Sequence, residues 1–267
     1  MFPRTVPRCC PLAFPQGELF GRINKVGRFP DEVAKFYAAE VALALSYLHD
    51  EAGVVYRDLK PDNVLIAVTG HVLLADFGFA RKVGNAGGVA DGLIFGDECG
   101  TSQYLAPEIT SGKGEPHGKA VDWWAFGCLV YEMLTGRPPY GDTSKLTKYE
   151  VFIRINAGKV KYPRASVSPD ARELLERGLL VADQRVRWRW DAVAACAWFA
   201  TVDFHALHDR RIPPPFLPMS DGGRPLAIGD HKHFIDWGRQ DDTQAFAAGT
   251  DSRALTTVEK RYAQFFL

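Results

Sequence analysis

The chain has 267 residues, of which 46% are hydrophobic and 24% are charged, close to the averages for soluble globular proteins. Its 32 basic residues balance 32 acidic ones, so net charge favours neither nucleic acid nor an anionic membrane as a partner. No stretch approaches the ~20 apolar residues of a membrane span, and the five cysteines include no C-x-x-C pair. We therefore expect a soluble protein of the cytoplasm, or also of the nucleus, without a disulfide framework or zinc site.

Hydrophobic periodicity predicts a mainly α-helical, α+β domain. Residues 30–50 begin with a Pro-Asp helix start and continue with apolar residues at helical spacing. Residues 64–76 read VLIAVTGHVLLAD, which predicts a small hairpin that turns at Thr69-Gly70. Residues 121–136 are apolar around most of the circumference of a helix, so we expect a buried central helix there. Weaker helices are predicted at 145–157, 169–180 and 190–197, and after Phe199 the prolines and glycines predict an extended tail.

Four polar residues carry the strongest chemical pattern. Asp58, Lys60 and Asn63 lie in RDLKPDN, and Asp76 follows in DFG, at the end of the second predicted strand. Two oxygen ligands for magnesium and a carboxylate free to accept a hydroxyl proton are what phosphoryl transfer requires. Each motif alone is weak, because an isolated Asp-Phe-Gly is usually a turn and a lone Arg-Asp is usually a surface pair. Their order, followed by APE at 106–108, indicates protein kinase chemistry.

Longer segments resemble the large lobe and C-terminal tail of AGC-type serine/threonine protein kinases, and within that group the cAMP-dependent catalytic subunits. The matching segments are GELF, GRFPDEVAKFYAAE, YRDLKPDN, DFGFA, CGTSQYLAPEI, AVDWWAFG, YEMLTGRPPY, WFATVDF and PPPFLP. The resemblance implies a kinase large lobe at 16–199 with short β-hairpins, a non-homologous stub at 1–15, and an extended tail at 200–267.

The resemblance also implies roles for the polar cluster, with ATP and Mg²⁺ as cofactors. Asp58 would be the catalytic base, Lys60 would neutralise the transferring phosphoryl group, and Thr101 would hydrogen-bond to both. Asn63 and Asp76 would hold the metal ions.

Further positions would bind the nucleotide and the substrate. Phe14, Leu65 and Phe234 would contact the nucleotide, and Glu18 would meet the ribose and a substrate arginine. An acidic groove completed by Asp62 and Glu132 would favour protein substrates with Arg or Lys upstream of the phosphoacceptor, since carboxylates pair well with arginine. A cyclic-nucleotide-binding regulatory subunit is a further implied partner.

The activation segment, residues 76–108, has expected contacts of its own. Glu108 and Arg187 would form a buried ion pair, and Asp122 would hold the catalytic loop from below. The stretch 80–98 is longer than usual in the family and rich in glycine, which predicts an insertion.

Asp97 stands where the family carries its activating phosphothreonine. It would either pair with Arg57 and Arg81 as a permanent substitute for phosphate, or be a solvated loop aspartate. Glu98 and Ser102 replace apolar pocket residues of the family, so the preference for the residue after the phosphoacceptor is in doubt.

The residues before Gln16 contain no glycine-rich loop and no lysine, so the small lobe of a kinase is expected to be missing from this sequence, either through a truncated gene model or in a natural half-kinase. We expect the 267-residue chain alone to be inactive or weakly active. The alternative function is a non-catalytic binding module that offers its groove to a regulatory subunit or pseudosubstrate.

Overall fold

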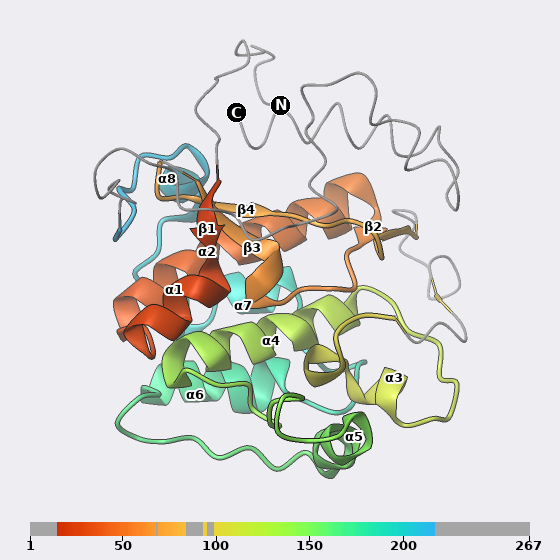
Figure 1. Cartoon of the computed structure of the whole chain (residues 1–267). Coiled ribbons are helices and arrows are strands. Elements are labelled where there is room, and N and C mark those ends of the chain that lie inside the picture. The colour runs from red at the N-terminus through yellow and green to blue at the C-terminus, as the bar shows by residue number, and fades with distance from the viewer. Residues whose placement is uncertain (1–14, 68, 84–92, 95–98, 217–267) are drawn as a thin grey trace.

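The computed structural model describes residues 15–67, 69–83, 93–94 and 99–216 (Figure 1). The helices are α1 (Leu19–Val26), α2 (Asp31–Ser46), α3 (Pro107–Thr110), α4 (Ala120–Thr135), α5 (Lys148–Ala157), α6 (Pro169–Glu173), α7 (Trp190–Ala194) and α8 (Phe204–His208). The strands are β1 (Pro15–Glu18), β2 (Val54–Val55), β3 (Val64–Ala67), β4 (Val72–Leu74) and β5 (Arg81–Lys82). Short π-helical turns follow α2 (Tyr47–Ala52) and α6 (Leu174–Leu179), and 3₁₀ turns lie at Pro61–Asn63, Ser102–Tyr104 and Ala197–Phe199. In this part of the chain no helix combines the length and apolar character needed to cross a bilayer.

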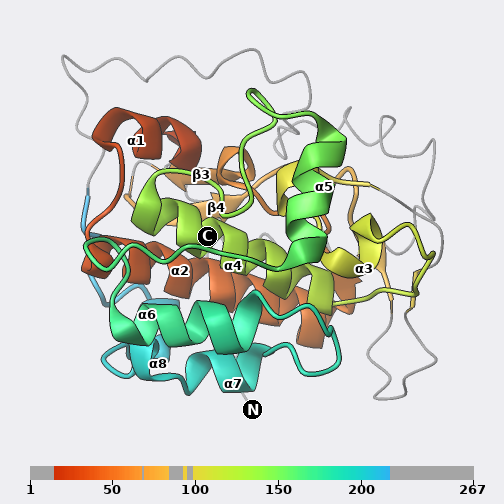
Figure 2. The same ribbon diagram turned by 90° about the horizontal axis from the view of Figure 1, so that it is seen from below.

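Helix α4 is the core of the domain, as the sequence predicts. Its residues 120–134 are all buried, including the two acidic ones. Helix α2 begins at Asp31, as its Pro-Asp start indicates, and packs beside α4 (Figure 2). The apolar side of α2, with Tyr37, Val41 and Leu45, is buried almost completely.

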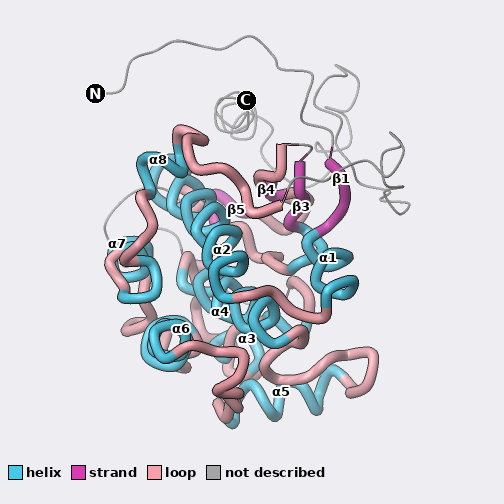
Figure 3. Tube along the Cα trace, turned by 90° about the vertical axis from the view of Figure 1, so that its left-hand side faces the viewer, coloured by secondary structure: helices cyan, strands magenta, loops and turns pink. Residues whose placement is uncertain are grey.

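The predicted hairpin is confirmed as β3 and β4, which pair antiparallel with Leu65 opposite Leu73. Strand β1 pairs with the other edge of β3, and the resulting sheet lies beside α1 and at the end of the helical layer (Figure 3). The sequence analysis does not predict β1, because its four residues, PQGE, show no alternation of apolar and polar side chains. Strands β2 and β5 form a separate two-residue ladder that joins Val54 to Lys82 and Val55 to Arg81.

Several helices begin or end at other residues than the sequence predicts. Helix α5 begins at Lys148 rather than 145, because Thr147 caps it and accepts from the backbone of Glu150. Helix α7 ends at Ala194 rather than 197. Helix α1 has no counterpart among the predicted elements, although Leu19 and Ile23, four residues apart, are both buried.

The expectation of an extended tail directly after Phe199 is wrong for residues 204–208. Asp203 caps α8 by accepting from the backbone N–H groups of His205 and Ala206, at 3.0 and 2.9 Å. Ala206 and Leu207 are then buried, and α8 contacts α2. A five-residue helix with one apolar turn leaves too short a pattern to be recognised from periodicity.

Glu108 and Arg187 form the expected buried ion pair. Arg187 donates Nη1 to Glu108 Oε1 at 2.7 Å and Nη2 to Oε2 at 2.9 Å, with both side chains almost completely excluded from solvent. Arg187 Nη1 also donates to the carbonyl of Ala120, at the start of α4. The pair therefore fixes the end of the activation segment to the core helix.

Arg187→Met would leave the Glu108 carboxylate buried without its partner. We expect this change to lower the free energy of unfolding by about 3–5 kcal/mol, as for other broken buried pairs, measured by urea denaturation. The matched control is Arg185→Met, since Arg185 pairs with Asp183 at the surface and its loss should change little. Equal effects of the two substitutions would contradict a structural role for the buried pair.

Candidate functional site

The backbone of the catalytic loop, which we define as residues 56–63, is fixed by one buried carboxylate. Asp122 Oδ2 accepts from the backbone N–H of Tyr56 at 2.8 Å, and Oδ1 accepts from that of Arg57 at 2.7 Å. The ring of His49 lies 2.8 Å from Oδ2 through Nε2. Arg57 has a φ of 70°, a left-handed conformation that costs energy in a residue with a side chain. The two backbone hydrogen bonds that Asp122 accepts offset that cost and turn the chain toward Asp58.

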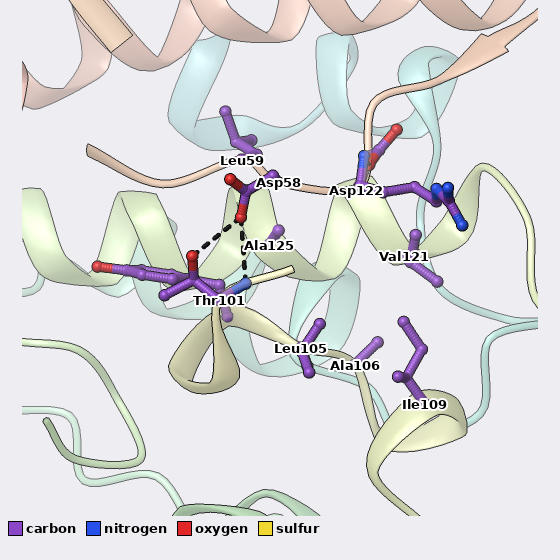
Figure 4. A pocket seen from close by; sticks show the side chains of 11 residues that line it. Asp58, Leu59, Thr101, Leu105, Ala106, Ile109, Val121, Asp122 and Ala125 are labelled. Carbon is purple, nitrogen blue, oxygen red and sulfur yellow. Dashed lines mark hydrogen bonds between the residues drawn. The ribbon is translucent and has the colours of Figure 1, made fainter. Parts of the chain in front are cut away.

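Asp58 is the centre of a dense hydrogen-bond network. Its Oδ1 accepts from the backbone N–H and the hydroxyl of Thr101, at 3.1 and 2.9 Å (Figure 4). Its Oδ2 accepts from Lys60 Nζ and Asn63 Nδ2, both at 2.9 Å. Lys60 Nζ also donates to Thr101 Oγ1 at 2.9 Å, so the contacts expected of Thr101 with Asp58 and Lys60 are both present.

Gly100 permits this close approach of the activation segment to the catalytic loop. Its φ is 107°, a region that favours glycine. A Cβ at this position would lie 2.7 Å from the carbonyl oxygen of Arg57 and 3.0 Å from Leu105 Cδ2. Any side chain here would push Thr101 away from Asp58.

Asp76 lies beside this network on a strained and exposed turn. Its φ is 53°, and its Oδ1 accepts from the backbone N–H of Gly78 at 3.1 Å. The preceding residue, Ala75, is tied to the catalytic loop twice: its N–H donates to the carbonyl of Asn63, and its carbonyl accepts from the hydroxyl of Tyr56. The structure therefore brings the backbone that leads into Asp76 close to Asn63.

Asn63 and Asp76 fit the requirements of a magnesium site. The amide nitrogen of Asn63 donates to the backbone carbonyl of Asp58 at 2.8 Å and to its carboxylate. This assignment leaves the amide oxygen of Asn63 as an available ligand. Mg²⁺ bound with nucleotide typically uses one or two protein ligands, with substrate phosphates and waters supplying the rest.

A small, partly open pocket lies directly beneath Asp58, between the catalytic loop, residues 101–109 and the first turns of α4 (Figure 4). Leu59, Leu105 and Ala125 give it an apolar lining. No residue of β1 or β3 lines this pocket, so it is separate from the expected adenine position at Leu65. It marks the interface on which the activation segment packs.

Some of the other predicted site residues lie within the part of the chain that the structure describes, and others lie outside it. Leu65 is buried in β3, and its partner across the ladder is Glu18 at the end of β1. Arg57 donates Nε to the carbonyl of Phe79 at 2.6 Å, and Arg81 is exposed in β5. The predicted contacts of Phe14, Phe234 and Asp97 lie outside the described residues, so the proposed pairing of Asp97 with Arg57 and Arg81 stays a prediction.

Glu132 is buried on α4, and its Oε2 accepts from the hydroxyl of Tyr104 at 2.7 Å. The pKa of Glu132 is raised to about 7, chiefly by burial; the hydrogen bond from Tyr104 lowers this pKa, and the negative charges of Asp62 and Asp142 raise it. Asp62 therefore belongs to the same electrostatic environment as Glu132. Tyr104 and Asp142 cannot be identified from sequence, because contacts across 28 and 10 positions leave no local pattern.

The sequence-family model described as "Protein kinase domain" matches residues 12–199. The chain therefore belongs to the protein kinase family, and its similarity to cAMP-dependent catalytic subunits supports the AGC-type assignment. It is 44% identical over 224 residues to the cAMP-dependent protein kinase catalytic subunit of Arthrobotrys oligospora, covering 82% of this chain and 39% of that protein. It is 43% identical over 209 residues to the cAMP-dependent protein kinase catalytic subunit of Dictyostelium discoideum, covering 76% and 30%.

The cAMP-dependent protein kinase catalytic subunit PRKX of Homo sapiens is 39% identical over 237 residues, which cover 86% of this chain and 60% of that protein. The chain thus spans less than two thirds of the length of each of these relatives. Their shared catalytic-subunit name describes those proteins.

The raised pKa of Glu132 predicts a specific pH dependence of stability. The folded pKa of about 7 lies above the unfolded value of 4.5, so stability falls as pH rises through this window. Glu132→Gln removes the titration. We therefore expect the stability of the variant relative to wild type to increase by about 3 kcal/mol between pH 4.5 and pH 8, at 1.4 kcal/mol per pKa unit. The free energy of unfolding is measured with urea for both proteins. If the difference between Glu132→Gln and wild type stayed constant across that pH range, the pKa of Glu132 would not be raised by folding.

Proposed function

We propose that this chain is the catalytic part of an ATP-dependent serine/threonine protein kinase. The observation that carries the proposal is the convergence of Asp58, Lys60, Asn63 and Thr101 in one hydrogen-bonded network. Membership of the kinase family supports it. We further propose that residues 16–199 form the kinase large lobe and that 200–267 form an AGC-type tail.

Asp58 would accept a hydrogen bond from the serine or threonine hydroxyl of the substrate and take up its proton as the oxygen attacks the γ-phosphorus of ATP. The bond between the γ-phosphorus and the β–γ bridging oxygen then breaks, and ADP leaves. Lys60, held by both Asp58 and Thr101, supplies positive charge beside the transferring group. Asn63 and Asp76 would hold Mg²⁺, which neutralises phosphate charge when bound.

The acidic residues favour basic protein substrates. Glu132 and Asp62 share one electrostatic environment, and Glu18 ends β1, which contacts the turn that carries Asp62. Arginine pairs bidentately with such carboxylates. A cyclic-nucleotide-binding regulatory subunit is a proposed partner, in line with the names of the relatives.

The experiment measures phosphorylation of an Arg-Arg-x-Ser peptide. The described residues include no glycine-rich loop of the kind that covers ATP phosphates in kinases, so the 267-residue chain is compared with a fusion that carries a cognate small lobe before Gln16. The chain alone should not exceed an Asp76→Ala control, because the phosphates would lack part of their cationic surroundings and water would enter the site. The fusion should turn over at roughly 1–100 s⁻¹.

Asp58→Asn in the fusion should abolish turnover and leave nucleotide affinity largely intact, because Asp58 acts on the hydroxyl and does not hold the nucleotide. Nucleotide affinity is measured separately by titration with a fluorescent ATP analogue. Undiminished turnover by this variant would remove Asp58 from its proposed role. A fusion that binds the peptide without phosphorylating it would instead favour the non-catalytic binding module.

A further inference from the structure

A chain of hydrogen bonds leads from the loop before α5 to the buried carboxylate of Glu132. The backbone N–H and the hydroxyl of Thr143 donate to Gln103 Oε1 at 3.1 and 3.2 Å. Gln103 Nε2 donates to the hydroxyl oxygen of Tyr104 at 3.1 Å. Tyr104 in turn donates to Glu132 Oε2 at 2.7 Å. Three separate parts of the chain are thereby connected through one amide.

The chemistry of these groups fixes the direction of each hydrogen bond. A backbone N–H can only donate, so the Gln103 atom that faces Thr143 must be the amide oxygen. The amide nitrogen then faces Tyr104 and donates to its oxygen. Since a tyrosine hydroxyl has a single proton, that proton is left for Glu132. Gln103 therefore determines that Tyr104 acts as a donor to the carboxylate.

Glu132 has the properties of a carboxylate prepared for a cationic ligand. It is only 3% exposed. Among the described residues the one hydrogen-bond partner of its carboxylate is Tyr104, and this carboxylate takes part in no ion pair. The titratable groups that face it are Tyr104, Asp62 from the catalytic loop, Asp142 from the loop before α5, and Cys128 on α4 itself. A buried acid surrounded by other acids and without a cation is costly unless a ligand supplies the charge.

We propose that Gln103 is a positioning residue for substrate selection: by directing the hydroxyl of Tyr104 toward Glu132, it holds the Glu132 carboxylate oriented to receive a basic side chain of the substrate. This inference rests on the proposed function and adds a residue that does not touch the substrate's reacting atoms. With Oε2 engaged by Tyr104, the Oε1 oxygen of Glu132 is the one that meets the incoming cation.

The proposal predicts a coupling between Gln103 and Tyr104 that a purely structural role would not produce. Gln103→Met removes both contacts without changing charge, and Tyr104→Phe removes the final donor. Gln103→Met should weaken the binding of an Arg-Arg-x-Ser peptide by about 2- to 12-fold, the range for one neutral hydrogen bond, and Tyr104→Phe by about 12- to 160-fold, because its hydroxyl donates to a carboxylate. Each should also raise the pH at which affinity is half-maximal, because a carboxylate that loses a donor holds its proton more tightly. The double variant should be no weaker than Tyr104→Phe alone.

Affinity is measured by fluorescence anisotropy of the labelled peptide on the 267-residue chain between pH 5.5 and 8.5, so that the result does not depend on turnover. Gln184→Met is the matched control, since Gln184 donates to the carbonyl of Pro116 and should leave both affinity and midpoint unchanged. Gln103→Glu keeps the shape and the acceptor for Thr143 but cannot donate, so it should also raise the midpoint. Circular dichroism melts establish that each variant folds.

Additive effects of the two single variants, an unshifted midpoint in Gln103→Met, or absence of peptide binding by the wild-type chain would each overturn the proposal. The proposed function fails in a different way. A small-lobe fusion that binds the peptide with the predicted coupling but transfers no phosphate would reject the kinase activity and leave the role of Gln103 intact. Turnover without preference for basic peptides would reject the role of Gln103 and leave the activity intact.

Discussion

The carboxylate of Asp122 is the contact on which the arrangement of the site depends. It accepts two backbone N–H groups from the catalytic loop and lies beside His49, all inside the core. Without it, the left-handed conformation of Arg57 would lack its stabilising partners, and Asp58 would lose its fixed approach to Thr101. A carboxylate with no measurable exposure is tolerated because donors satisfy both of its oxygens.

Helix α4 carries Asp122 and also contacts other parts of the site. Asp122 and Glu132 lie ten positions apart on the same rigid helix, a distance of about 15 Å along its axis. The carbonyl of Ala120 at its start accepts from Arg187, whose partner Glu108 ends the activation segment. Helix α4 therefore positions three parts of the proposed site. These are the catalytic loop, the end of the activation segment that packs beneath it, and Glu132, the acid expected to select the substrate. This explains why α4 is apolar around nearly its whole circumference.

Much of the fold could be predicted from the sequence, because each of these elements has a pattern within its own segment. The helical period at 30–50, the apolar run at 121–136 and the hairpin turn at Thr69-Gly70 each specify their structure within one segment. The contacts of Asp58 with Thr101, and of Glu108 with Arg187, were reached through the family resemblance rather than through periodicity. Tyr104, Gln103 and α8 were missed for a common reason: their importance arises from partners or burial supplied by distant segments, which no short window records.

The most direct test of the central claim, that Asn63 and Asp76 form the metal end of a phosphoryl-transfer site, uses a paramagnetic ion. Mn²⁺ and ATP are added to the isotope-labelled small-lobe fusion, and broadening of the backbone amide signals is measured by NMR. The account predicts that broadening among the described residues is strongest around Asn63 and Asp76, depends on ATP, and is lost in Asp76→Ala. Broadening centred elsewhere, or unchanged in Asp76→Ala, would contradict it.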